Sequence, residues 1–162
     1  MKSMFFGAAA LAALLVSGGA LAAEYTHIVL EKEVDASADT VWKMVGGFCA
    51  LTEWFKISDC TLTSGAGDIG TVRSLLGGQV TEVMITKGQY SYGYAFPNQN
   101  PTYYHGNLSV VPQGANKSKI VYTLLYDQES LGTPEAMAKN RESRVKRFTE
   151  ALENMKAMSE AK

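Results

Sequence analysis

The sequence predicts an α+β protein with one curved antiparallel sheet of seven strands, a long C-terminal helix and two short helices after the first strand. Two observations support this prediction. Segments with strand-like alternation or β-branched residues follow one another between residues 25 and 128, and glycine-containing breaks separate most of them. One long amphipathic pattern then closes the chain, and a helix of that kind can cover the apolar face of a single sheet.

The composition indicates a folded domain. The chain has 162 residues, of which 46% are hydrophobic, and its formal net charge is −1. Low net charge with this apolar content argues against a disordered chain. A non-specific nucleic-acid binder needs a clustered excess of Lys and Arg, so we expect no nucleic-acid partner.

The first 22 residues are predicted to be a signal peptide. Lys2 is the basic residue at the start, residues 4–16 form an apolar stretch, and residues 20–22 (Ala-Leu-Ala) fit a cleavage site. The apolar stretch is shorter than the roughly 20 residues that span a bilayer. We therefore expect cleavage after Ala22, export to a bacterial periplasm, and one domain over residues 23–162 without stable membrane insertion.

The first half of the domain is predicted to begin with a strand over residues 25–34. Ser37 can cap a helix that ends at Gly46-Gly47, and Trp42 lies in its apolar stripe, so we expect Trp42 in the core. A second helical piece covers residues 50–55. Six further strands are predicted over residues 58–64, 71–76, 79–87, 89–96, 104–112 and 120–128.

A literal G-x-G-x-x-G motif occupies residues 65–70. A dinucleotide-binding motif of this type lies between a strand and the start of a helix. Here residues 71–76 have the pattern of a strand, so we expect a hairpin loop.

The C-terminal segment is predicted to be a helix of about 25 residues. Thr133 can cap it and Pro134 suits its first position. Apolar residues recur at steps of three and four from Val145 onward. The basic residues are expected to form a solvated face; they are Arg141, Arg144, Lys146 and Arg147.

Cysteine and histidine give few candidates for special chemistry. In an oxidising compartment Cys49 and Cys60 can form a disulfide, but two buried thiols fit the sequence equally well. His27 and His105 are far apart and have no ligand cluster around them, so no metal site is expected.

A small polar set lies in strands that are otherwise apolar. Arg73 follows Thr71-Val72, and Glu82 shares its face of the strand with Val80 and Met84. Tyr92 shares a face with its neighbouring tyrosines, and Tyr104 begins the next strand. These residues are either ordinary surface and sheet positions or the polar lining of a cavity.

Two stretches resemble a known superfamily. Residues 34–42 (Val-Asp-Ala-Ser-Ala-Asp-Thr-Val-Trp) resemble the opening of START/birch-allergen-like helix-grip (SRPBCC) proteins, which include the bacterial polyketide cyclase/dehydrase family. A second set resembles the branch of lachrymatory factor synthase and the abscisic-acid receptors: Phe48-Cys49, Leu51, Trp54-Phe55, Cys60 and Gly70-Thr71-Val72-Arg73.

This resemblance implies a helix-grip fold with a ligand cavity between the sheet and the last helix. It implies that Arg73 and Glu82 project into the cavity, that Tyr92 and Tyr104 line it, and that Trp54 and Phe55 lie at its mouth.

Two functions remain open at this point. The first is binding of a small hydrophobic or amphipathic molecule, lipids included. The second is a cofactor-independent cyclase, dehydratase or isomerase, in which Arg73 stabilises an oxyanion and Glu82 moves a proton. The sequence does not specify the ligand or the oligomeric state, and no cofactor is expected for either function.

Overall fold

The computed structural model describes residues 25–97 and 103–161, and the predicted signal peptide lies outside the described residues. The first strand, β1 (Tyr25–Val34), leads to α1 (Ala38–Val45) and α2 (Leu51–Phe55). Six more strands follow: β2 (Cys60–Ser64), β3 (Val72–Leu75), β4 (Val80–Gly88), β5 (Ser91–Ala95), β6 (Tyr104–Pro112) and β7 (Ser118–Asp127). Two short 3₁₀ turns, Leu76–Gly78 and Glu129–Leu131, precede β4 and the long helix α3 (Pro134–Glu160). The predicted α+β fold is confirmed.

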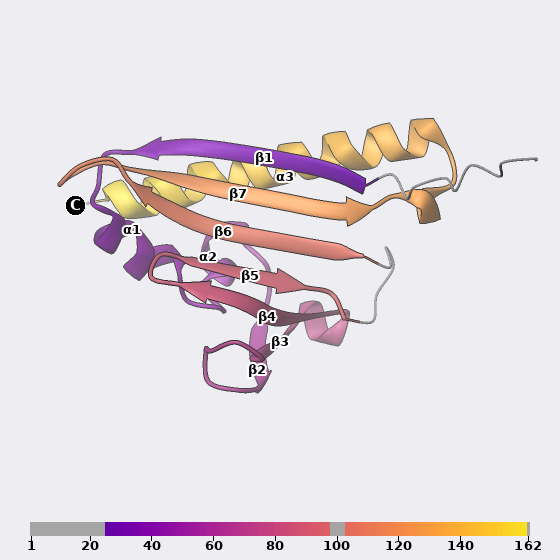
Figure 1. Cartoon of the computed structure of the whole chain (residues 1–162), viewed down its shortest axis with the longest axis horizontal. Coiled ribbons are helices and arrows are strands. Elements are labelled where there is room, and N and C mark those ends of the chain that lie inside the picture. The colour runs from indigo at the N-terminus through magenta and orange to yellow at the C-terminus, as the bar shows by residue number, and fades with distance from the viewer. Residues whose placement is uncertain (1–24, 98–102, 162) are drawn as a thin grey trace, which may run out of the picture.

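The strands form one antiparallel sheet in the order β1-β7-β6-β5-β4-β3-β2. Figure 1 shows α3 running behind β1 and β7, with α1 and α2 on the same side of the sheet. The register pairs Arg73 of β3 directly with Glu82 of β4. Irregular pairing between Leu62 and Ser64, and between Met84 and Thr86, interrupts two of the ladders, and such bulges increase the local bend and twist of a sheet.

Capping side chains mark where α1 and α3 begin. The Ser37 hydroxyl accepts a hydrogen bond from the Thr40 amide at 3.2 Å, which caps α1. The Thr133 hydroxyl accepts one from the Ala136 amide, also at 3.2 Å, at the start of α3. Both caps satisfy amide groups that have no partner inside the helix.

The core lies between the concave face of the sheet and α3. Burial alternates along β7 without interruption, so every second side chain points to the core. From α3 the buried side chains lie at helical spacing; they are Phe148, Ala151, Leu152, Met155 and Ser159. α3 therefore covers the sheet as the amphipathic pattern predicted.

The prediction that Trp42 is a core residue is wrong. Trp42 is only partly buried and lies beside the buried row that Val41 and Val45 form. Neighbouring helix positions differ by about 100° around the axis, so only one side of the predicted stripe reaches the core. The other tryptophan, Trp54 of α2, lies in the core and has no exposed surface.

The residues of the G-x-G-x-x-G motif form a turn between β2 and β3, as predicted. Gly65, Gly67 and Gly70 have φ values of 78°, 100° and 89°, which other residues rarely adopt. No helix follows, so the motif serves the turn and lacks the context of a phosphate site.

None of the helices in the described ranges is both long enough and apolar enough to cross a membrane.

Candidate functional site

A cavity of about 230 Å³ lies between α2, α3 and strands β3 to β7. About half of its wall is apolar, and the following aliphatic and aromatic side chains line it: Leu51, Trp54, Phe55, Ile57, Leu75, Leu76, Val80, Phe96 and Phe148. Its polar lining comes from both the sheet and α3: Arg73, Glu82, Tyr94, Tyr104, Tyr122, Arg144 and Arg147. A cavity whose wall combines apolar side chains with converging polar groups is typical of a ligand site.

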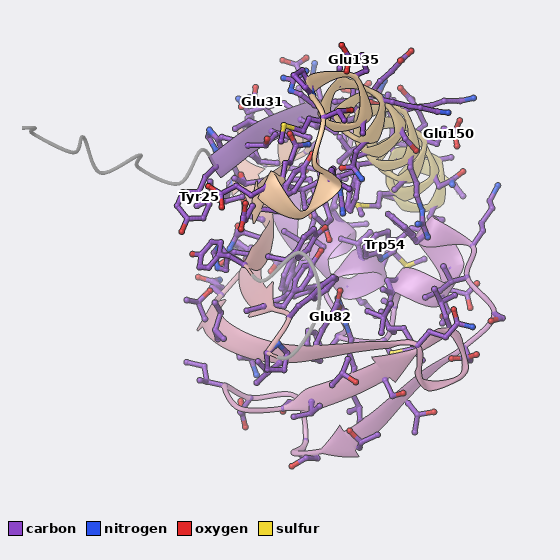
Figure 2. All side chains as sticks on the ribbon, turned by 90° about the vertical axis from the view of Figure 1, so that its right-hand side faces the viewer. Tyr25, Glu31, Trp54, Glu82, Glu135 and Glu150 are labelled. Carbon is purple, nitrogen blue, oxygen red and sulfur yellow. A yellow bond between two sulfur atoms is a disulfide. The ribbon has the colours of Figure 1, made fainter. Side chains whose placement is uncertain are left out.

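Arg73 and Glu82 form an ion pair in the wall of this cavity. As whole residues they are 0% and 4% exposed, and the Arg73 Nε atom donates to Glu82 Oε2 at 2.5 Å. Arg73 also donates to the carbonyl of Phe48, and its guanidinium lies 4.1 Å from the centre of the Phe48 ring. Figure 2 shows Glu82 on the inner side of the curved sheet, the side on which Trp54 also lies.

The two members of the pair differ in how burial affects them. Burial raises the pKa of the Glu82 carboxyl above its usual value of 4.5, and the charge of Arg73 opposes this rise. Burial acts to lower the pKa of Arg73, yet the neighbouring Tyr92 and Glu82 oxygens raise it above its usual value. Arg73 therefore remains a cation, and Glu82 is the member of the pair that can exchange a proton.

Three tyrosines place hydroxyl groups along the same cavity. The hydroxyls of Tyr94 and Tyr122 are 2.9 Å apart and share a hydrogen bond. Burial raises the pKa of Tyr104 to about 12 and raises those of Tyr94 and Tyr122 well above their usual value. All three hydroxyls are therefore protonated at neutral pH and can donate a hydrogen bond.

Tyr92 does not line this cavity, although the resemblance implied that it would. Its ring packs 5.4 Å from that of Phe48 and 6.0 Å from that of Trp42. α1 and the segment after it fill the space around this end of β5. Tyr94, further along the same face of the strand, takes the expected position.

Trp54 and Phe55 both line the cavity, but in different surroundings. Trp54 is fully buried, and its carbonyl accepts a hydrogen bond from Asn154 of α3 at 2.9 Å. The ring of the half-buried Phe55 lies 4.9 Å from that of Phe148. Trp54 is thus part of the inner wall, and only Phe55 lies near the surface as the resemblance implied.

The prediction that the basic residues of α3 form a solvated face is wrong for Arg144, which is half-buried in the cavity lining. Arg147 is exposed as predicted, but it also lines the cavity. Arg144 lies over the rings of Tyr104 and Tyr126, at 4.9 and 4.5 Å. Arg147 lies 4.4 Å from the centre of the Phe55 ring. One signal in the sequence could have located Arg144, since it precedes the buried Phe148 by four residues and shares its side of the helix.

Cys49 and Cys60 form a disulfide with their Cα atoms 5.5 Å apart, which decides between the two states left open by the sequence. The bond joins the segment before α2 to the first residue of β2. It therefore holds the backbone next to Phe48, whose carbonyl binds Arg73. Within the described ranges, no group of three His, Cys, Asp or Glu side chains is placed to hold a metal ion.

This fold and cavity define a START-like helix-grip protein of the SRPBCC superfamily. Residues 25–160 match the family described as polyketide cyclase/dehydrase and lipid transport, and the chain belongs to that family. No curated protein matches the sequence significantly.

Solved structures with low sequence identity share the fold. The Zhui aromatase/cyclase from a Streptomyces species has a TM-score of 0.69 at 15% identity, over 85% of this chain and 94% of its own. A START superfamily protein from Mycobacterium smegmatis has a TM-score of 0.63 at 19% identity, over 81% and 97%. Norcoclaurine synthase from Thalictrum flavum, solved with dopamine and hydroxybenzaldehyde, has a TM-score of 0.60 at 17% identity, over 100% and 99%.

Proposed function

We propose that this protein binds a small amphipathic molecule in the cavity between the sheet and α3. The observation that carries the proposal is the cavity itself, with about 230 Å³ of space, a wall of aliphatic and aromatic side chains, and an ion pair among its polar groups. A cavity of about 150 Å³ is enough to hold benzene, whereas typical ligand pockets measure roughly 300–1,000 Å³. The volume therefore favours one ring with a short substituent over a long-chain lipid.

The cavity offers such a molecule both apolar contact and polar anchoring. Its aliphatic and aromatic wall removes a ring from water, which stabilises the complex in proportion to the apolar area buried. Arg73, Glu82 and the tyrosine hydroxyls supply donors and an acceptor for a hydroxyl or carbonyl group. Norcoclaurine synthase, which shares the fold, was solved with two one-ring molecules, and this agrees with the proposed size class.

A second candidate function is proton-transfer catalysis without a cofactor. The observation that favours it is Glu82, a buried carboxyl with a raised pKa beside a permanent cation. In that role the Glu82 carboxylate takes a proton from the carbon next to a substrate carbonyl. Arg73 stabilises the enolate oxygen that forms, and Glu82 returns the proton at another position.

Export to an oxidising compartment is part of the proposal. Residues 1–22 have the composition of a signal peptide, and disulfides such as Cys49–Cys60 persist outside the reducing cytosol. Fractionation of a bacterium that expresses the full chain, with mass spectrometry of the product, tests this part. A periplasmic chain that begins at residue 23 supports export, and an uncleaved cytosolic chain contradicts it.

Native mass spectrometry of the purified full-length product tests ligand binding. We expect a bound molecule of low mass that disappears when Val80→Phe fills part of the cavity. Ile69→Phe is the matched control, because Ile69 is 64% exposed and does not line the cavity. An empty wild-type protein that also fails to bind any one-ring compound from a fragment collection contradicts the proposal.

Hydrogen exchange in D₂O separates catalysis from binding alone. Phenylacetaldehyde and phenylacetone carry exchangeable protons next to a carbonyl, and ¹H NMR follows their loss. Catalysis predicts faster exchange with the wild type and a return to the background rate with Glu82→Gln. Binding of either compound without faster exchange supports the binding function alone.

A further inference from the structure

The side of the cavity formed by α3 carries two cations that the proposed function does not use. Arg144 and Arg147 lie one helical turn apart and both line the cavity. Arg144 is half-buried and Arg147 is exposed, so Arg147 marks the place where the cavity meets solvent. We call Arg144 and Arg147 the α3 arginines.

No carboxylate among the described residues forms an ion pair with either of the α3 arginines. In the part of the chain that the structure describes, all six ion pairs involve other basic residues. Arg73 has its own partner in Glu82, so the pair inside the cavity contributes no net charge. The lining therefore carries two positive charges in excess, both on its α3 side.

Contacts with uncharged groups hold Arg144 in place and leave its charge without a counter-ion within the described ranges. Its Nε atom donates to Asn140 Oδ1 at 2.9 Å, and its guanidinium lies over the rings of Tyr104 and Tyr126. These contacts orient the guanidinium but supply no anion. Orienting a group before binding reduces the entropy lost when a ligand arrives.

We propose that the ligand is a small carboxylate, with its anionic group on the α3 arginines and its apolar body in the cavity. A guanidinium presents paired donors that match the two oxygens of a carboxylate, and such charge-assisted bonds are stronger than neutral ones. The opposite wall, with Arg73 and Glu82, then faces the end of the ligand away from its carboxylate. This inference rests on the proposed function and specifies the chemical class of its ligand.

Matched pairs of probes test the charge of the ligand separately from its shape. The probes are benzoate, phenylacetate, cinnamate and hexanoate, each compared with its neutral primary amide. Binding to the purified full-length product is measured by ligand-observed NMR and, for the tightest pair, by calorimetry. We expect the best carboxylate to bind at least about tenfold more tightly than its amide.

Substitutions on α3 then locate the preference. Arg144→Gln/Arg147→Gln is expected to bring the affinities of the acid and its amide within about twofold of each other. Arg141→Gln is the matched control, because Arg141 is an exposed arginine of the same helix outside the cavity lining. Circular dichroism confirms that each variant is folded before its affinity is compared.

The outcomes distinguish this inference from the function on which it rests. Equal binding of acids and amides to the wild type overturns the carboxylate class and leaves the binding function in place. A preference that survives in the double variant, or competition by inorganic phosphate as strong as that by the carboxylates, also overturns the inference. Failure of every probe in both series to bind contradicts the proposed function and the inference together.

Discussion

The loss of stability caused by replacing Arg73 should be partly reversed by a second substitution at Glu82. In Arg73→Met the carboxyl of Glu82, which is 4% exposed, loses the cation that stabilises its charged form. Removing one partner of a buried ion pair costs about 3–5 kcal/mol, because the other charge stays buried without compensation. In the double variant Arg73→Met/Glu82→Gln no charge is left, so we expect it to be more stable than Arg73→Met alone.

The gain in stability from the second substitution should be large at high pH and small at low pH. The unpaired carboxyl can avoid its buried charge by taking up a proton. At pH 8, which is 3.5 units above its usual pKa of 4.5, protonation costs about 5 kcal/mol, and this sets the upper limit of the penalty. At pH 4.5 the same step costs almost nothing. The double variant still lacks the contacts of Arg73 with Phe48, which are worth about 1–2 kcal/mol. We therefore expect a rescue of about 2–3 kcal/mol at pH 8 that nearly vanishes at pH 4.5.

Urea denaturation followed by circular dichroism measures this rescue, with the wild type, both single variants and the double variant at the two pH values. Additive effects of the two substitutions at pH 8 would refute the buried-pair reasoning. A rescue of equal size at both pH values would also refute it, since the charge of Glu82 would then not be its source.

Three more predictions concern stability and use the same denaturation assay. Burial raises the pKa of Glu82 in the folded chain, so the contribution of this carboxyl to the free energy of unfolding is fully present below pH 4.5 and is lost as the pH rises through the folded pKa. We therefore expect the wild type to lose stability relative to Glu82→Gln as the pH is raised, and a gain contradicts this. Trp54→Ala should cost about 3–5 kcal/mol and Trp42→Ala clearly less, since only Trp54 is fully buried; equal losses contradict the assignment. Cys49→Ser/Cys60→Ser should cost about 2–3 kcal/mol, because the disulfide closes a loop with a separation of 11 residues; an unchanged urea midpoint contradicts this.

Local signals predicted the elements of this fold with good accuracy. The Ser37 and Thr133 caps, the glycines of the turns and the spacing of apolar residues on α3 all act within a few residues of the chain. The strand boundaries were less accurate, and β2 begins at Cys60 where the pattern predicted residue 58. The end of a strand depends on its partner in the ladder, which lies far away in the sequence.

The candidate site was predicted in part. Alternation along β3 and β4 identified Arg73 and Glu82 as polar residues in apolar strands, but only their cross-strand pairing and the nearby Phe48 carbonyl make them one buried unit. Their joint position came from a resemblance, and the structure places both in the cavity wall.

The sequence by itself determined the α+β class, the order of the elements and the polar residues in the strands, because short-range spacing and capping carry that information. Only the tertiary structure decided which tryptophan is buried, that Tyr94 replaces Tyr92 at the cavity, and that Arg144 and Arg147 line it. Each of these depends on how α1 and α3 pack against the sheet. A helix pattern defines an apolar side only to within about one residue, roughly 100° around the axis, and packing selects among the side chains at its edge.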